Sequence, residues 1–315
     1  MRKLHSRQHT IGREVRCEGI GLHSGTNVAM KLIPAPPNFG IRFKRRDTPG
    51  LPPIAAHPWR VVDTVLATSI GVNGVVVSTI EHLMAALMGC NVDNVLIEVD
   101  GTEIPIVDGS AAPYVDLLTE AGRREQNAPR RYVRVTQPFV VKEGDAYIQA
   151  FPSQRMQIRY IIDFPHPLVG RQEMKWTFDP AGFRREIALA RTFGFLKDVQ
   201  KLQRMGFALG GSLSNAVVFN EDGLLNREGF RFSNECVRHK ILDFLGDLAL
   251  AGVVLVGRFE AYKAGHSLHN RFIRELMTRE NAVRGAGPAA LAPPFLAPVP
   301  IPPIMDPFPT LGKTM

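Results

Sequence analysis

The chain has 315 residues, 45% of them hydrophobic and 22% charged, and we expect a soluble protein of two domains. No apolar run is long enough to span a bilayer, the N-terminus lacks the apolar core of a signal peptide, and three dispersed cysteines suit a reducing cytoplasm. The net charge of +8 fits a phosphate-bearing small molecule, a membrane surface or simple solubility, and the absence of nucleic-acid motifs argues against nucleic acid.

The first half of the chain is predicted to contain short strands followed by helix, strand and helix. Glycine and proline clusters separate the first strands, which we place at Arg13–Glu18, Val28–Ile33, Ile41–Arg45, Thr64–Ile70 and Val75–Val77. A helix is predicted over Thr79–Met88 with Gly89 as its C-terminal cap, then a strand over Asn94–Val99 and a helix over Ala112–Ala121. Residues 121–130 are polar and contain a glycine and a proline, so we place a domain boundary there.

The second half repeats this order of elements. Its first strands are predicted at Tyr132–Val141, Ala146–Phe151, Gln157–Asp163 and Glu173–Phe178. The helix, strand and helix that follow are predicted at Glu235–Leu250, Val253–Tyr262 and Ser267–Asn281. Runs of strands followed by helices predict the α+β class, with two similar domains at residues 1–126 and 127–284, each a sheet layered with helices.

Two segments depart from the repeated order. Residues 196–219 form an extra, partly apolar stretch in the second half that contains the pair Gly210 and Gly211. Residues 285–315 carry nine prolines between Pro288 and Pro309, which rules out a helix and predicts an extended or disordered tail.

The predicted helix over 235–250 carries two groups that suit a metal ion. His239 and Asp243 are four residues apart and leave the same helix face. Such a pair also occurs as a surface hydrogen bond or ion pair. Here the flanking residues are apolar around most of the helix, so burial is predicted, and Asp247 adds a second carboxylate one turn on. A catalytic zinc typically takes three protein ligands and keeps one position for water, so a third ligand is needed.

The predicted helix after Ser78 offers that ligand. His82 is a metal-binding side chain, and Glu81 beside it suits the general base of a hydrolase. An alternative interpretation is a capping box, in which Glu81 reaches back to the Ser78 amide and is unavailable as a base. His266 at the start of the last predicted helix is either a cap or surface residue or an acid in the reaction.

Six segments together resemble a known family. They are Gly21–Gly25 (GLHSG), Ser78–Leu83 (STIEHL), Ile104–Ser110 (IPIVDGS), Ala190–Phe195 (ARTFGF), Val237–Asp243 (VRHKILD) and Tyr262–His266 (YKAGH). In this order, across roughly residues 11 to 280, they resemble the zinc-dependent UDP-3-O-acyl-N-acetylglucosamine deacetylases of lipid A biosynthesis. The resemblance implies a sandwich of two similar α+β domains with the active site at their junction.

The resemblance also implies a role for each matching residue. His82, His239 and Asp243 would bind Zn²⁺, and Glu81 would be the base that activates the water. The remaining roles concern the substrate: His266, oriented by Asp247, would protonate the leaving amine, Thr192 would stabilise the oxyanion with the zinc, Phe193 would line the sugar site, and Lys240 would meet the diphosphate of UDP.

The implied activity is hydrolysis of the N-acetyl group of UDP-3-O-((R)-3-hydroxyacyl)-N-acetylglucosamine, which releases acetate in the committed step of lipid A biosynthesis in Gram-negative bacteria. The stretch 196–219 would form a hydrophobic passage for the 3-O-acyl chain. We expect a cytoplasmic monomer that meets the membrane surface transiently. The tail after about Gly285 departs from the family pattern.

Two competing interpretations stay open from the sequence. One is a metal-free nucleotide- or lipid-binding module with a buried histidine–aspartate pair. The other is a hydratase activity fused to or substituted on the same fold, which ranks lower because little chain remains after residue 285 for a second enzyme.

Overall fold

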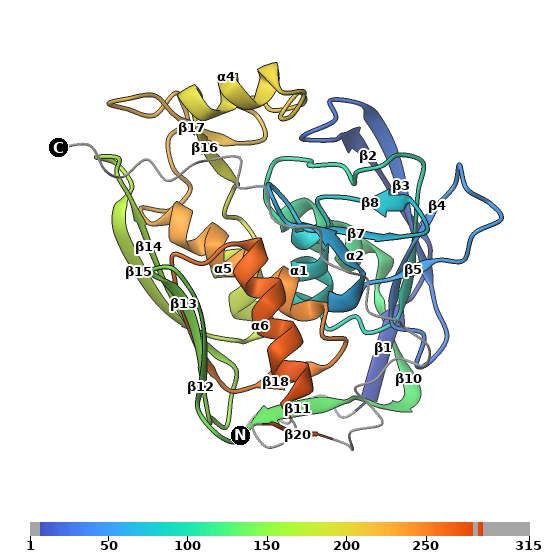
Figure 1. The fold of residues 1–315 in the computed structure, drawn as a ribbon. Coiled ribbons are helices and arrows are strands. Elements are labelled where there is room, and N and C mark those ends of the chain that lie inside the picture. The colour runs from blue at the N-terminus through green and yellow to red at the C-terminus, as the bar shows by residue number, and fades with distance from the viewer. Residues whose placement is uncertain (1–6, 280–282, 286–315) are drawn as a thin grey trace.

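The computed structural model describes residues 7–279 and 283–285, so the predicted proline-rich tail lies outside the described residues from 286 onward. Two five-stranded sheets form the outer layers, and the long helices lie between them (Figure 1). The α+β prediction is confirmed. None of the described helices combines the length and the apolar character that a membrane crossing requires.

The first sheet has the order β2-β3-β9-β4-β5. Its strands are β2 (Val15–Ile20), β3 (Asn27–Pro34), β4 (Ile41–Arg45), β5 (Ile54–Ala55) and β9 (Val95–Val99). In β3 the buried side chains alternate, with Val28, Met30 and Leu32 on the inner face. This period of two gives the sheet one apolar face, which the helices cover.

The second sheet repeats the first with the order β12-β13-β19-β14-β15. Its strands are β12 (Phe139–Glu143), β13 (Ala146–Phe151), β14 (Gln157–Phe164), β15 (Gly170–Thr177) and β19 (Arg258–Tyr262). In both sheets only the pair between the third and fourth strands of this order is parallel, β9 with β4 and β19 with β14. The repeated plan expected from the sequence is therefore present as repeated topology.

Helices fill the space between the two sheets (Figure 1). They include α1 (Glu81–Gly89), α2 (Ala112–Ala121), α5 (Glu235–Ala249) and α6 (His266–Thr278). Helices α1 and α5 occupy equivalent places in the two halves and pack on each other at the centre of the molecule (Figure 1). Because both helices are covered over most of their surface, several of their ionisable residues are buried, including Glu81, His82, His239 and Asp243.

Short elements complete the fold. The extra stretch of the second half forms α4 (Leu196–Arg204) and then β17 (Val217–Phe219), which pairs in parallel with β16 (Phe193–Phe195). The other short elements are β1 (Arg7–Ile11), η1 (Pro58–Arg60), β6 (Val61–Asp63), β7 (Ser69–Val72), β8 (Val75–Val77), β10 (Arg123–Pro129), β11 (Tyr132–Val135), α3 (Pro180–Gly182), the π-helix η2 (Phe183–Ile187), β18 (Val254–Val256) and β20 (Val283–Gly285).

Several predicted boundaries are wrong for physical reasons. The expected linker is mostly strand β10, which pairs with β1. The strand expected over Thr64–Ile70 begins only at Ser69. Gly89 ends helix α1 instead of capping it, and the left-handed residue that follows is Asn91, with φ of 56°. The division into domains at 1–126 and 127–284 stays a prediction.

Candidate metal centre

The contact between α1 and α5 depends on a glycine. A Cβ atom at Gly246 would lie 2.0 Å from the carbonyl oxygen of Glu81, so only glycine permits the backbones to approach this closely. The contact joins the two halves of the chain. It brings His82 from α1 next to His239 and Asp243 from α5.

These three side chains form a compact set of donor atoms. One nitrogen of each histidine and one oxygen of Asp243 lie within 4.8 Å of one another. Asp243 Oδ1 is 3.2 Å from His239 Nε2 and 3.6 Å from His82 Nε2, and the two imidazole rings are perpendicular. Two imidazole nitrogens and one carboxylate oxygen are a donor set that zinc accepts.

Neighbouring groups hold two of these side chains in place. His239 Nδ1 lies 3.0 Å from the Ala190 carbonyl oxygen, so it donates there and the ring directs Nε2 toward the other two groups. Asp243 Oδ2 accepts a hydrogen bond of 2.8 Å from Lys240 Nζ. Burial alone would raise the pKa of Asp243, but His239 and Lys240 outweigh it and hold that pKa well below its usual value. These contacts favour the ionised form of Asp243, which is the form that binds a metal.

Glu81 is not part of a capping box, so that alternative is wrong. The Ser78 amide donates to the Thr102 carbonyl oxygen at 2.9 Å, and the cap residue of α1 is Ile80, which makes no side-chain cap bond. Glu81 Oε2 instead accepts from the Thr68 amide at 3.0 Å. Burial raises the pKa of Glu81, although the neighbouring His266 and His82 act to lower it. A carboxylate with a raised pKa beside a metal set suits a general base.

A second group of ionisable side chains lies one helical turn along α5. His266 Nδ1 and His269 Nδ1 each lie 2.7 Å from Asp247 Oδ2, and Thr68 Oγ1 donates to Asp247 Oδ1 at 2.5 Å. These nitrogens have the spacing of metal ligands, but both serve as donors to the carboxylate. We therefore interpret this group as a hydrogen-bonded cluster and the first group as the metal centre.

The charges within this cluster stabilise each other. Burial alone would raise the pKa of Asp247, but His266 and His269 outweigh it and lower the pKa to about 2. Burial alone would lower the pKa of His266, but Asp247 outweighs it and raises the pKa to about 9. His266 is thus a cation near neutral pH, which is the state a general acid requires.

The other residues named from the sequence lie on the second-half side. Lys240 Nζ is bonded to Asp243 and lies 5.8 Å from the centre of the Phe193 ring, whose own distance to the His239 ring is 6.3 Å. Thr192 follows the Ala190 carbonyl by two residues, and its amide donates to the Gly109 carbonyl oxygen at 2.8 Å.

Sequence reasoning missed three residues around the centre. Thr68 was assigned to a strand, but it lies in the loop before β7 and contacts both Glu81 and Asp247. His269 follows His266 by three residues on one helix face, and that spacing was an available signal. Glu103 accepts hydrogen bonds from the amides of His23 and Ser24 and from the Thr79 hydroxyl. The bond to Thr79 holds the segment that leads into α1.

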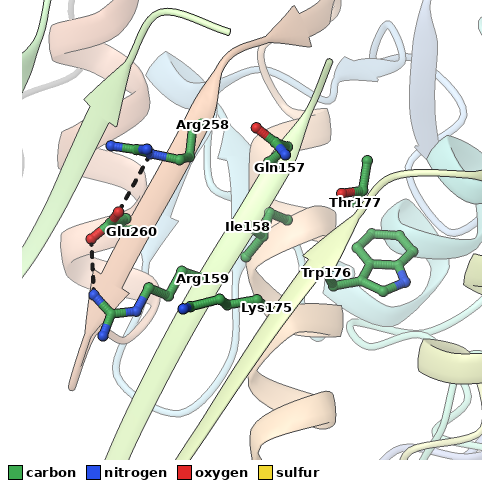
Figure 2. Close-up of a pocket in the computed structure, with 8 residues that line it drawn as sticks. All are labelled: Gln157, Ile158, Arg159, Lys175, Trp176, Thr177, Arg258 and Glu260. Carbon is green, nitrogen blue, oxygen red and sulfur yellow. Dashed lines mark hydrogen bonds and ion pairs between the residues drawn. The ribbon is translucent and has the colours of Figure 1, made fainter. Parts of the chain in front are cut away.

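A cavity of about 310 Å³ lies away from this centre, on the second sheet (Figure 2). Its polar walls are ion-paired, because Glu260 contacts Arg159 at 3.2 Å and Arg258 at 3.4 Å. None of the candidate site residues lines it.

Comparisons with known proteins agree on one family. The family model for UDP-3-O-acyl N-acetylglycosamine deacetylase, LpxC, matches residues 8–278. A UDP-3-O-acyl-N-acetylglucosamine deacetylase from Acidithiobacillus ferrooxidans is 48% identical over 278 residues, which cover 88% of this chain and 91% of the relative. Proteins of the same name from Oleidesulfovibrio alaskensis and Haemophilus influenzae are 47% and 43% identical, covering 87% and 88% of this chain and 90% and 92% of the relatives.

Proposed function

The chain belongs to the UDP-3-O-acyl-N-acetylglucosamine deacetylase family, and from that premise we propose that the centre between α1 and α5 hydrolyses the N-acetyl group of the UDP-linked, 3-O-acylated glucosamine and releases acetate. The protein is a hydrolase of the lipid A pathway. We infer that the ion is Zn²⁺ and that His82, His239 and Asp243 hold it.

One observation carries the proposal. Three donor atoms of buried side chains from two different helices lie within 4.8 Å of one another. The neighbouring carboxylate of Glu81 accepts a hydrogen bond from the Thr68 amide and takes no part in a helix cap. Two imidazoles and one carboxylate match the number and kind of protein ligands in catalytic zinc sites, so these residues would hold the ion and leave room for a water. When bound, zinc would lower the pKa of a water and polarise the amide carbonyl.

The proton transfers are assigned to two side chains, Glu81 as the base and His266 as the acid. Glu81, held at Oε2 by the Thr68 amide, takes a proton from the attacking water. His266, kept cationic by Asp247, has its Nδ1 committed to that carboxylate, so Nε2 is the nitrogen left to give a proton to the leaving amine. Burial raises the pKa of Glu81, which makes it a stronger base, and Asp247 raises the pKa of His266 against its burial, which keeps it protonated near neutral pH.

Three further residues are proposed to bind the substrate. Thr192, on the segment that carries the Ala190 carbonyl, would stabilise the oxyanion together with the metal. Phe193 would line the sugar site. Lys240 would meet the UDP diphosphate, which requires its ammonium group to divide its contacts between Asp243 and the phosphate.

The stretch at 196–219 is proposed to receive the acyl chain and to meet the membrane surface in passing. Apolar side chains are exposed just after α4, with Met205 at 50%, Phe207 at 41% and Leu209 at 51%. Lys201 and Arg204 lie beside them, which suits anionic lipid head groups. Cosedimentation with anionic vesicles should weaken in a Phe207→Ser, Leu209→Ser variant, and unchanged binding would contradict the membrane contact. We further propose a cytoplasmic monomer.

Metal analysis joined to a deacetylation assay tests the proposal. Glu81→Ala and His266→Ala proteins should keep near-stoichiometric zinc and lose turnover, whereas His239→Ala should lose both. Full activity in Glu81→Ala or His239→Ala would refute the mechanism. A parent protein that holds no metal after mild purification and binds the UDP-sugar without releasing acetate would favour the binding-module interpretation.

A further inference from the structure

His269 is a buried ionisable residue to which the reaction above gives no role. It lies on α6, three residues after His266, and its side chain is fully buried. Its Nδ1 reaches the same oxygen of Asp247 as His266 Nδ1 does, at the same distance of 2.7 Å. Two imidazole rings thus share one carboxylate oxygen.

The ring of His269 is held from its other side as well. The Tyr160 hydroxyl lies within hydrogen-bond distance of both His269 Nε2, at 2.9 Å, and the Ala264 carbonyl oxygen, at 2.7 Å. The Phe244 ring packs against the imidazole with 4.9 Å between centres. Strand β14, helix α5 and the loop that opens α6 therefore converge on His269, which makes its orientation fixed.

We propose that His269 is a positioning residue for the deacetylation, acting through Asp247: its Nδ1–H fixes the carboxylate and limits how tightly that carboxylate holds the proton of His266. This inference rests on the proposed function, because His266 is the acid of that reaction. His269 itself does not touch the reacting atoms.

The direction of the effect follows from hydrogen-bond chemistry. A donor on Asp247 Oδ2 disperses the negative charge of the carboxylate and makes it a weaker partner for His266. Removing that donor should strengthen the pair and raise the pKa of His266 further above its ordinary value. The other ionisable groups around His266 are unchanged by this substitution: Glu81 on α1, Asp243 on α5 and His23 after β2.

The test compares two substitutions that differ in one hydrogen bond. His269→Leu removes the donor and fills its space with an apolar side chain, whereas His269→Asn keeps an amide donor close to the place of Nδ1. The basic limb of the kcat/KM profile marks deprotonation of the acid. In His269→Leu we expect this limb to move up by roughly 0.5 to 1 pH unit, the order of one ordinary hydrogen bond, because the effect reaches His266 only through Asp247. In His269→Asn the basic limb should lie at the same pH as in the parent protein.

A second readout does not depend on turnover. The titration of the His266 ring, followed by NMR of ¹⁵N-histidine protein and assigned with His266→Asn, should shift upward in His269→Leu by the same amount. If the parent lacks deacetylase activity, the proposed function fails while this titration still tests the role of His269.

Two controls keep the inference falsifiable. Tyr160→Phe preserves the side-chain volume and loosens the His269 ring, so it should move the basic limb in the same direction by a smaller amount. This variant tests the inference if His269→Leu does not fold. His9→Leu makes the matched change at a buried histidine 4.0 Å from a carboxylate of Asp93, and should leave both the limb and the His266 titration in place. An unshifted His266 titration in folded His269→Leu or Tyr160→Phe protein would overturn the inference.

Discussion

The close approach of the α1 and α5 backbones at Gly246 predicts what one added methyl group would do to the protein. At Gly246 the added Cβ would lie 2.0 Å from the Glu81 carbonyl oxygen, 2.7 Å from its carbonyl carbon and 3.0 Å from its Cα. A relaxed carbon–oxygen contact needs about 3.3 Å, so Gly246→Ala must separate α1 from α5 by about 1 Å. Alanine would improve helix propensity by about 1 kcal/mol, whereas overpacking a filled core costs about 1–3 kcal/mol.

We expect the cost of the steric clash to exceed the gain in helix propensity at this position, because the clashing atoms of Glu81 belong to the backbone and cannot rotate aside. We expect Gly246→Ala to lower the free energy of unfolding by up to about 2 kcal/mol in urea titrations, which is the overpacking cost less the gain in helix propensity. The metal set should suffer more than the fold, because His82 lies on one helix and its two partners on the other. A 1 Å misplacement at a reacting centre costs about 10²-fold in rate.

Zinc content and deacetylation measured on the same samples complete this experiment. Gly50→Ala is the matched control, since a Cβ there meets no atom within 4 Å and the residue does not need a left-handed conformation. A Gly246→Ala protein as stable as the parent, with full zinc content and turnover, would refute the claim that this glycine sets the geometry of the centre.

Three further results are expected. Arg191→Ala should destabilise the protein by about 3–5 kcal/mol in denaturant titrations, because it strands the buried Glu235 carboxylate that Arg191 Nε contacts at 2.9 Å. His82→Ala should lose tightly bound zinc in dialysis against a chelator while retaining its circular dichroism spectrum. Asp247→Asn should move the basic limb of the pH–rate profile down from about 9 toward the ordinary histidine value of 6.5. Since the folded-state pKa of His266 is raised, its stabilisation is complete below pH 6.5 and disappears as pH rises through about 9, so parent and Asp247→Asn should converge in thermal stability at high pH.

The parts of the fold that the sequence predicted are those with strong local periodicity. Helix α2 and strands β4 and β13 have the predicted bounds, and α5 ends one residue earlier than predicted. Strands were mispredicted where tertiary contacts interrupt a continuous apolar pattern. The strand expected over Val253–Tyr262 breaks at Gly257, where a Cβ would lie 2.8 Å from a methyl group of Val135.

The site was predictable only as separate pieces. The spacing of His239 and Asp243 is a local helical property, so it was visible in the sequence. Nothing local relates His82 to them, and the resemblance to a family supplied that link before the structure placed the three together. Thr68 could not be found in this way. It reaches the centre through the conformation of its loop, and the residues around it match no motif.

The symmetry of the two halves explains why the centre lies where it does. Helices α1 and α5 hold equivalent places, so each half on its own would leave an apolar helix face and several ionisable groups uncovered. Packing the halves together covers both helices and places Glu81, His82 and the carboxylates of α5 in one buried seam. Buried charges of this kind persist only when each is paired or hydrogen-bonded. Thr68, a residue of the first half, bonds to Glu81 of the same half and to Asp247 of the other, so one residue connects the proposed base to the second half.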